Sequence, residues 1–417
     1  MPLTGTLRVP GDKSISHRCL MLGALSEGVS HFSGLLDGED VRSTARCLQQ
    51  LGVNIDFEAG RVHGVGLSGL KSPAAPLDCG NSGTTFRLLM GILAAQPFAS
   101  TLTGDVSLSK RPMTRVAQPL NGLGANITLT REKYPPVTLE ARTTPLRGGS
   151  YALPIASAQV KSALLLAGLY SQEPVVLSGR LDSRDHTEKM LPAFGVQLEQ
   201  GADHITLPVG QKLTACDFSV PGDPSSAAFW LAAAAMVPGS EITLEQVSLN
   251  ATRICFFEVL KGMGAEISWK QQGAQTEPMG QVHLRYAPLK AVTLEARDIP
   301  FLVDEVPLIA LLGTQAEGTT RVRGAEELRV KECDRLAAMG QNLQSMGAIW
   351  KDYPDGFDVT GKQPLQGSKW TCFHDHRIAM TGVLAGLVVE GNHQIDDPDC
   401  IAVSYPGFMQ DLNRLQS

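Results

Sequence analysis

The sequence repeats one pattern about six times, with a period of about 70 residues. Each copy begins with a small polar segment and an Ala/Leu-rich helical stretch, which is followed by a short strand-like run and a second helix. Five of the second helices end in a related signature, in which a glycine would cap the helix and a strand would start after it. These signatures begin at Leu51, Leu123, Phe194, Met263 and Met346. The pattern predicts an α/β fold assembled from similar units.

The tetrapeptide Val-Pro-Gly-Asp occurs at Val9 and again at Val220, and it divides the copies into two sets of three. The sixth copy stops at Ser417 without its closing strands. We therefore expect the N-terminal strand, Leu3 to Val9, to join the C-terminal half. This predicts two three-unit domains, 12–222 and 1–11 plus 223–417, with hinges at Pro10–Asp12 and Pro221–Asp223.

The charge of the chain points to small-molecule partners. The formal net charge is −6 and no basic run is present, which argues against a nucleic-acid or anionic-membrane binder. The eight cysteines show no zinc-like spacing, which favours free thiols in a reducing compartment. Met1 to Gly5 lacks the pattern of a signal peptide and no apolar run is long enough to cross a bilayer, so we expect a cytoplasmic protein.

The segment VPGDKSISHR, Val9 to Arg18, combines a turn, a helix start and two cations. A helix should begin near Ser14, and its first N–H groups, together with Lys13 and Arg18, would attract a phosphate or a carboxylate. Similar helix starts in the other copies carry more cations. They are Arg87, Lys110, Arg111, Arg115, Lys161, Arg184, Arg253, Lys331, Arg335 and Arg377, which together predict an anion-binding cleft.

Two acidic residues occupy comparable helix starts in the second half, Asp304 in FLVDEVP and Glu332 in VKECDR. Carboxylates beside lysines can act as acid–base groups. The alternative for either residue is a helix cap or a partner of the helix dipole.

Nine motifs in order carry a resemblance to a known family: PGDKSISHR, GNSGT, KRPMTR, SAQVKSALLLAGL, RDHTE, PGDPSSAAFW, NATR, LRVKECDR and DHRIAM. Over essentially its whole length the chain resembles the 5-enolpyruvylshikimate-3-phosphate synthases, also called 3-phosphoshikimate 1-carboxyvinyltransferases. RDHTE and NATR are similar to the branch of this family found in many bacteria. The resemblance implies an inverted α/β barrel of six βαβαββ units, arranged as two domains that close on the ligands.

The resemblance also implies the activity. The enolpyruvyl group of phosphoenolpyruvate would pass to the 5-hydroxyl of shikimate 3-phosphate, and phosphate would be released without a metal or an organic cofactor. This is a step of the shikimate pathway of aromatic amino-acid biosynthesis, and we expect a cytoplasmic monomer. Glyphosate is expected to compete with phosphoenolpyruvate, since Gly83 leaves room for it.

Individual roles follow from the resemblance residue by residue. The implied contacts of shikimate 3-phosphate are Lys13, Ser14, Arg18, Ser157, Ala158, Gln159, Arg184, Asp304 and Lys331. The implied contacts of phosphoenolpyruvate are Lys13, Asn81, Gly83, Arg115, Gln159, Arg335 and Arg377. Asp304 matches the group that receives the hydroxyl proton and Glu332 the group linked to proton transfer at the methylene carbon, with Lys13 and Lys331 as further catalytic residues. The sequence does not divide the acid and base work among them.

The chain departs from the family pattern at three positions. Cys333 stands where threonine is usual, His374 where glycine is common, and Val403 where another branch has a lysine that contacts phosphoenolpyruvate. His374 and His376 form a lone His-x-His, which is too weak a pattern to predict a metal site.

Two alternatives share the expected fold. A UDP-N-acetylglucosamine enolpyruvyl transferase would carry a reactive cysteine in the loop where this chain has Val106. A catalytically silent anion-binding protein would not need Lys13, Asp304, Lys331 and Glu332 together, and all four are present.

Overall fold

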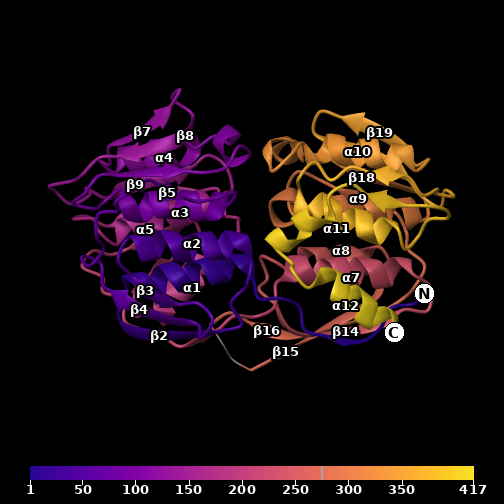
Figure 1. Cartoon of the computed structure of the whole chain (residues 1–417). Helices are drawn as coiled ribbons and strands as arrows, with labels where there is room; N and C mark the ends of the chain where they lie inside the picture. Colours follow the sequence, from indigo (N-terminus) through magenta and orange to yellow (C-terminus); the bar gives the residue numbers. More distant parts are fainter. Residues whose placement is uncertain (274–275) are drawn as a thin grey trace. The chain divides into compact units, whose positions relative to one another are not determined.

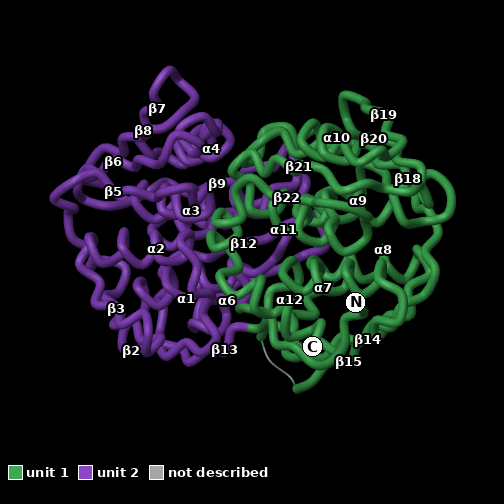
Figure 2. The backbone as a smooth tube through the Cα atoms, turned by 45° about the vertical axis from the view of Figure 1, so that its right-hand side comes forward, with its two compact units in different colours: residues 1–10, 221–417 green, residues 11–220 purple. Residues whose placement is uncertain are grey.

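The computed structural model describes residues 1–273 and 276–417, which form two compact units (Figure 2). Unit 1 comprises Met1–Pro10 and Pro221–Ser417, and unit 2 comprises Gly11–Val220. The boundaries therefore fall at 10/11 and 220/221, beside the expected positions at 11/12 and 222/223. Movement about these two turns stays a prediction.

Six pairs of helices form the repeats (Figure 1). The first helices of the pairs are α1 (Lys13–Leu25), α3 (Gly83–Leu93) and α5 (Ala158–Gly168) in unit 2, and α7 (Pro224–Met236), α9 (Val306–Gln315) and α11 (His376–Ala385) in unit 1. The second helices are α2 (Glu39–Gln50), α4 (Thr114–Gly122), α6 (His186–Ala193), α8 (Cys255–Gly262), α10 (Arg335–Ser345) and α12 (Phe408–Gln416). The repeat predicted from the sequence is thus confirmed.

The strands of unit 2 form three four-stranded sheets. Their orders are β13 (Phe218–Ser219), β2 (Glu27–Ser33), β4 (Arg61–Val65), β3 (Asn54–Asp56); β5 (Leu77–Asp78), β6 (Ser100–Thr103), β8 (Tyr134–Leu139), β7 (Ile127–Thr130); and β11 (Glu199–Gln200), β12 (His204–Leu207), β10 (Val175–Gly179), β9 (Gly149–Leu153). In each sheet one outer pair is parallel and the other pairs are antiparallel.

Unit 1 repeats this arrangement twice and ends with a two-stranded sheet. The orders are β1 (Thr4–Leu7), β14 (Glu241–Ser248), β16 (Met279–Arg285), β15 (Glu266–Gln272); β17 (Thr293–Leu294), β18 (Thr319–Val322), β20 (Gly356–Thr360), β19 (Ile349–Tyr353); and β21 (Lys369–Trp370), β22 (Gln394–Ile395). Four 3-10 helices complete the described elements: η1 (Leu108–Lys110), η2 (Ile299–Phe301), η3 (Glu326–Val330) and η4 (Pro398–Val403).

The strands before α1 and α7 each belong to the other half of the chain. β1 precedes α1 but pairs in parallel with β14 of unit 1, which confirms the expected place of the N-terminal strand. β13 precedes α7 but pairs in parallel with β2 of unit 2. The turn at Gly11 needs glycine, because a Cβ there would lie 1.9 Å from the carbonyl oxygen of Gly34.

The recurring signatures end the second helices as predicted. Their glycines adopt a left-handed backbone, with φ between 82° and 96°. L-residues with a side chain rarely tolerate this conformation, so glycine follows each of these helices. The five residues are Gly52, Gly124, Gly195, Gly264 and Gly347.

Each unit has its own hydrophobic core around its first helices. In unit 1, α7, α9 and α11 contact one another, and every residue of the Ala-rich α7 is buried. In unit 2, α3 contacts both α1 and α5. A helix that is apolar all round belongs inside a core, which leaves its polar N-terminus as the place for ligand-binding side chains. Within the described residues, no helix is both long enough and apolar enough to cross a membrane. All eight cysteines are free thiols, as expected.

Candidate active site

Most residues implied as ligand contacts lie close to helix N-termini, in unit 1 and in unit 2. Lys13, Gly83, Ala158 and Arg335 are the first residues of α1, α3, α5 and α10. The first turns are capped by side chains: Asp12 accepts from the N–H of Ile15 at 2.9 Å, and Ser82, Ser157, Asp334 and Asp375 act similarly. The remaining N–H groups and the helix dipole make these ends suited to anions.

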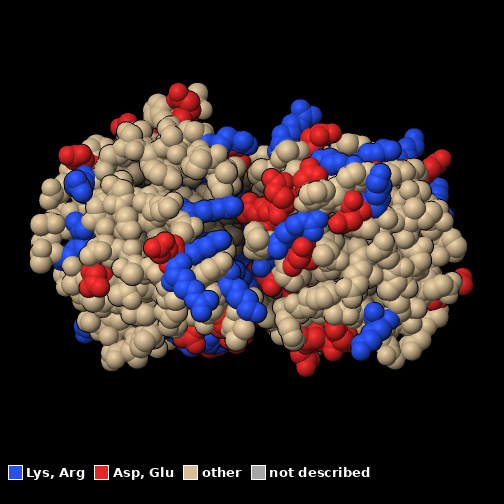
Figure 3. Space-filling view, turned by 90° about the horizontal axis from the view of Figure 1, so that it is seen from above, with Lys and Arg blue, Asp and Glu red and all other residues tan. Residues whose placement is uncertain are grey.

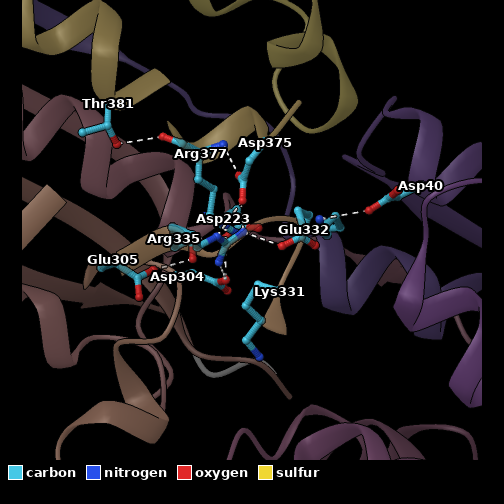
Figure 4. A network of polar contacts seen from close by, with 12 residues as sticks. Asp40, Asp223, Asp304, Glu305, Lys331, Glu332, Arg335, Asp375, Arg377 and Thr381 are labelled. Atoms are coloured by element: carbon cyan, nitrogen blue, oxygen red, sulfur yellow. Dashed lines mark hydrogen bonds and ion pairs between the residues drawn. The ribbon is translucent and has the colours of Figure 1, made fainter. Parts of the chain in front are cut away.

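Arg335 is the centre of the site in unit 1 (Figure 4). Its side chain is 2% exposed and forms ion pairs with three carboxylates. The distances are 2.8 Å to Asp375, 2.7 Å to Glu332 and 3.4 Å to Asp304. Arg377 adds a second cation, with its Nε 3.2 Å from the same Oδ1 of Asp304. Two arginines implied as phosphoenolpyruvate contacts therefore share the carboxylate implied as the base.

The charges of this cluster hold one another in the ionised state. Burial would lower the pKa of Arg335, but the charges of Asp375, Glu332 and Asp304 outweigh it and raise the pKa above its ordinary value. Burial would raise the pKa of Asp375, but the charge of Arg335 outweighs it and the pKa is lowered. Both groups are charged near neutral pH.

Cys333, which replaces the usual threonine, contacts this pair. Its Sγ lies 3.7 Å from Oδ2 of Asp375. Burial and the nearby charge of Asp375 raise the pKa of the thiol, so it stays protonated and can donate. The thiol thus provides the donor that a hydroxyl would otherwise supply.

Asp304 does not cap α9. The N-cap of that helix is Glu305, and Asp304 forms ion pairs with Arg335 and Arg377. Its side chain is 17% exposed, which leaves it partly accessible. The alternative of a helix cap is therefore wrong, and the acid–base interpretation of Asp304 stays a prediction.

Lys331 points away from Arg335 in Figure 4. Its Nζ forms an ion pair with Oε1 of Glu327 at 2.9 Å, and the two side chains are 27% and 41% exposed. Exposed pairs of this kind contribute only about 0 to 1 kcal/mol, so a ligand could draw Lys331 away from Glu327 at little cost. The structure does not place Lys331 against Asp304.

In unit 2, the two cations of α1 are already held by protein groups. Nζ of Lys13 lies 3.0 Å from Oδ2 of Asp40. Arg18 is buried and donates to Oγ1 of Thr187 at 2.7 Å, to Oγ of Ser162 at 2.7 Å and to the carbonyl of Ser14 at 2.8 Å. These contacts fix the direction of both side chains.

Gln159 connects the starts of α5 and α3. Its Oε1 accepts from Nη1 of Arg87 at 2.7 Å, and its Nε2 donates to Oγ1 of Thr84 at 3.2 Å. Asn81 is held in a similar way, because its Oδ1 accepts from Nη2 of Arg111 at 2.6 Å. Arg87 and Arg111 were expected only as general cations, yet they position two residues implied as ligand contacts.

His17, which the sequence patterns did not single out, is a buried histidine of α1. Its Nδ1 lies 2.7 Å from Oγ1 of Thr44, which lies 2.6 Å from Oγ1 of Thr85, which donates to Oγ of Ser82 at 2.7 Å. Burial lowers the pKa of His17 to about 3, so the imidazole is neutral at pH 7. This chain of contacts links α1 and α2 to the start of α3. The one signal in the sequence is the position of His17 between Lys13 and Arg18.

The other predicted residues differ in how exposed they are. Arg115 is exposed at the second position of α4, and Gly83 is buried at the first position of α3. The half-buried members of the set are Ser14, Ser157, Ala158 and Arg184. Val403 is the last residue of η4.

Two further cations expected in the anion cleft are paired with buried carboxylates, as Arg335 is, and their place in the cleft stays a prediction. Lys161 and Glu188 form an ion pair at 2.6 Å, and both side chains are 2% exposed. Arg253 donates to Asp223 at 2.8 Å and its side chain is also 2% exposed. A buried cation needs an opposite charge, and these two are committed to one.

His374 and His376 are not arranged as a pair of metal ligands. His374 is exposed and its Nδ1 lies 2.9 Å from Oδ2 of Asp397, whereas His376 is buried. His374 has φ 55°, which explains why glycine is common at this position. Over 1–273 and 276–417, no group of three or more His, Cys, Asp or Glu side chains could hold a metal ion.

Charged side chains are unevenly spread on the surface. Figure 3 shows one face, on which Lys and Arg gather in groups, several beside Asp and Glu, while most of that face is uncharged. Grouped cations on a chain of net charge −6 are suited to small anions rather than to a long polyanion.

Comparisons with known proteins point to one family over nearly the whole chain. A family profile described as EPSP synthase (3-phosphoshikimate 1-carboxyvinyltransferase) matches residues 1–412. A protein of Chloroflexus aurantiacus named 3-phosphoshikimate 1-carboxyvinyltransferase is 47% identical over 423 residues, covering 99% of this chain and 97% of that protein. One of the same name from Oceanobacillus iheyensis is 45% identical over 417 residues, with the same coverages.

Two solved structures extend the comparison to the fold. EPSP synthase from Acinetobacter baumannii superposes with a TM-score of 0.88 at 41% identity, covering 99% of this chain and 96% of that one. The enolpyruvyl transferase NikO from Streptomyces tendae superposes with a TM-score of 0.78 at 19% identity, covering 100% and 95%. The second likeness shows that the fold, with its open mixed sheets, is that of the enolpyruvyl transferases.

Proposed function

This chain belongs to the EPSP synthase family, and we propose that the Arg335 cluster is the part of its active site where phosphoenolpyruvate binds and protons move. The enzyme is a 3-phosphoshikimate 1-carboxyvinyltransferase of the shikimate pathway. It transfers the enolpyruvyl group of phosphoenolpyruvate to the 5-hydroxyl of shikimate 3-phosphate and releases phosphate. The observation that carries the proposal is the sharing of Asp304 by Arg335 and Arg377.

Because Arg335 and Arg377 share the carboxylate of Asp304, binding of phosphoenolpyruvate to the two arginines would change how basic that carboxylate is. The carboxylate of phosphoenolpyruvate would compete with Asp304 for the N–H groups of Arg335 and Arg377, because a planar guanidinium binds carboxylates in one preferred geometry. Released from these pairs, Asp304 becomes a stronger base for the 5-hydroxyl proton. Glu332, 2.7 Å from Arg335, is placed on the same guanidinium for proton transfer at the methylene carbon. Lys13 and Lys331 supply positive charge to the phosphates.

The remaining contacts are proposed from the resemblance to the family, residue by residue. For shikimate 3-phosphate these are Ser14, Arg18, Ser157, Ala158, Gln159 and Arg184, and for phosphoenolpyruvate Asn81, Gly83 and Arg115, with Gln159 reaching both. Caps, N–H groups and cations meet at these places, which suits the phosphate groups of both substrates.

Phosphate release tests the proposal directly. With both substrates present, wild-type protein should release phosphate, and omission of shikimate 3-phosphate should abolish the release. UDP-N-acetylglucosamine in its place distinguishes the related transferase, and absence of release with either acceptor would indicate an anion-binding protein without activity.

Arg115→Ala is expected to raise the Michaelis constant for phosphoenolpyruvate by about tenfold or more. A hydrogen bond to a charged group is typically worth about 1.5 to 3 kcal/mol, and the exposure of Arg115 favours the lower end. The constant for shikimate 3-phosphate should change much less. Steady-state kinetics with each substrate varied will measure this, with Arg131→Ala as the control. Equal effects on both substrates would show that Arg115 supports the start of α4 rather than contacting phosphoenolpyruvate.

We expect glyphosate to inhibit the wild-type protein. Gly83→Ala is expected to weaken that inhibition about tenfold. The added Cβ would lie 2.9 Å from Nη1 of Arg87, so Arg87 must shift and disturb its bond to Gln159. The shift itself should cost little stability, because Nη1 is the far end of a flexible side chain, so the expected effect is on the ligand site. Titration of glyphosate against varied phosphoenolpyruvate measures the change, with Gly122→Ala as the control, since no atom lies within 4 Å of a Cβ there. An insensitive wild type would refute the steric argument.

We further propose that the enzyme works as a cytoplasmic monomer without a cofactor, and that its two turns at Pro10–Asp12 and Pro221–Asp223 act as hinges. Support comes from Pro and Gly at both turns, which are the places where the chain passes from one unit to the other. Shikimate 3-phosphate should lower the radius of gyration in small-angle scattering. An unchanged radius at saturation would contradict the hinges.

A further inference from the structure

A second buried cluster of charges lies next to Asp304 in the chain. Asp223, Ser225, Arg253 and Glu305 are all at most 9% exposed. Oγ of Ser225 donates to Oε1 of Glu305 at 2.5 Å. Nη2 of Arg253 donates to Oγ of Ser225 at 2.9 Å and to Oδ1 of Asp223 at 2.8 Å. The cluster therefore joins the first turn of α7 to the first turn of α9.

From this geometry we propose that Glu305 is a positioning residue that holds Asp304 in its productive direction, with Ser225 and Arg253 as its supports. The inference rests on the proposed role of Asp304 as the base. Asp304 and Glu305 are consecutive, and their side chains bind different partners: Asp304 binds Arg335 and Arg377, and Glu305 binds Ser225. Figure 4 shows both carboxylates on one turn of the chain.

The start of α9 has no side-chain cap of its own, which makes the bond from Ser225 important. The turn contains backbone bonds from the N–H groups of Glu305 and Val306 to the carbonyl of Leu302, at 2.8 and 3.0 Å. Such bonds shape the turn but do not attach it to the rest of unit 1. Glu305 attaches this turn to α7 through Ser225, beside the ion pairs of Asp304, and it does so inside the core, where a charged hydrogen bond is strong.

The other end of the cluster is equally fixed. Asp223 caps α7 by accepting from the N–H of Ser225 at 2.8 Å. Arg253 ends the NATR motif, in which Oδ1 of Asn250 accepts from the N–H of Thr252 at 2.9 Å, and Nδ2 of Asn250 donates to Glu277 at 2.9 Å. The NATR motif thereby serves to present Arg253 to Ser225, a role that its sequence alone did not suggest.

Catalysis is sensitive to small displacements, and an error of about 1 Å in a reacting group can cost about a hundredfold in rate. Removal of the Glu305 carboxylate frees the turn at the residue directly after Asp304. We therefore expect an effect on turnover rather than on substrate binding.

The test compares Glu305→Ala with Glu305→Gln, whose amide oxygen still accepts from Ser225. Glu305→Ala should lower kcat about tenfold or more, with both Michaelis constants within about threefold of wild type, and Glu305→Gln should restore kcat to within about threefold. Ser225→Ala removes only the hydroxyl and should act in the same direction. Glu317→Ala, an exposed change after the end of α9, is the control. Circular dichroism confirms that each variant is folded.

A double variant separates this inference from the proposed role of Asp304. In the Asp304→Asn background, Glu305→Ala should cause no further loss of kcat, because it acts through Asp304. If the losses of kcat in the two single variants add fully in the double variant, the positioning role of Glu305 is wrong and the role of Asp304 is untouched. The same holds if Glu305→Ala and Ser225→Ala lower the melting temperature but leave kcat unchanged. If Glu305→Ala does not fold, Ser225→Ala takes its place, and its kcat is compared in the wild-type and Asp304→Asn backgrounds. If Asp304→Asn keeps full turnover, the proposed base fails, and this inference with it.

Discussion

Asp304→Asn should lower turnover about a hundredfold or more while changing the affinity for shikimate 3-phosphate less than about tenfold. Asparagine has nearly the same shape but cannot accept the proton of the 5-hydroxyl. The substitution also removes a negative charge that lies 3.4 Å from Arg335 and 3.2 Å from Arg377. Both cations would then be more available to the carboxylate of phosphoenolpyruvate, so binding of that substrate should not weaken.

Single-turnover kinetics and equilibrium binding of shikimate 3-phosphate measure the two effects separately. Asp298→Asn is a matched control, because Asp298 lies six residues earlier and its carboxylate accepts a bond from the backbone of Glu295. That control should change turnover less than about threefold, as surface substitutions away from a site usually have small effects. Turnover in Asp304→Asn equal to that of wild type would remove Asp304 from the mechanism.

Asp375→Ala should destabilise the protein by about 3 to 5 kcal/mol and strongly weaken phosphoenolpyruvate binding. Breaking a buried ion pair is strongly destabilising, and Asp375 is the most buried of the three carboxylates beside Arg335. Glu332 and Asp304 remain beside the guanidinium, so we expect the lower end of this range. The substitution also deletes the cap of α11, which accepts from the N–H of Arg377 at 2.9 Å. The carboxylate of Asp375 thus supports two arginines at once: it accepts from the guanidinium of Arg335 and from the backbone N–H of Arg377.

Urea unfolding measures the loss of stability, and steady-state kinetics measure the effect on phosphoenolpyruvate. Asp352→Ala is the control, because its pair with Arg329 is exposed and should be worth less than about 1 kcal/mol. The pKa of Asp375 is lowered from 3.8 in the folded protein. Its stabilising contribution is therefore present above pH 3.8 and is lost as the pH falls below it, so wild type should lose more stability in acid than the variant. A variant as stable as wild type would show that Arg335 does not depend on Asp375.

Much of the fold could be predicted because its signals are local. Helix periodicity, the capping oxygens of Asp12 and Asp223, and the glycines after the second helices act within a few residues of one another. The place of β1 also followed, since an incomplete sixth repeat requires a strand from elsewhere. Repetition made these weak local signals decisive.

The partners of the charged side chains could not be predicted in this way. Lys161 and Arg253 stand at helix starts like Lys13 and Arg335. The structure pairs each of these cations with a carboxylate distant in sequence, Lys161 with Glu188 and Arg253 with Asp223. Arg335 meets Asp375, 40 residues later in the chain. No periodicity encodes such a distance.

The sequence by itself determined the repeat, the two halves, the helix starts and the collection of cations and carboxylates at those starts, because these depend on backbone propensity and short-range capping. Only the tertiary structure decided which cation meets which carboxylate. An ion pair requires two side chains to come within about 4 Å, and for residues far apart in the chain that distance depends on how the sheets and helices pack. The attachment of Glu305 to Ser225, 80 residues apart, is a result of that packing.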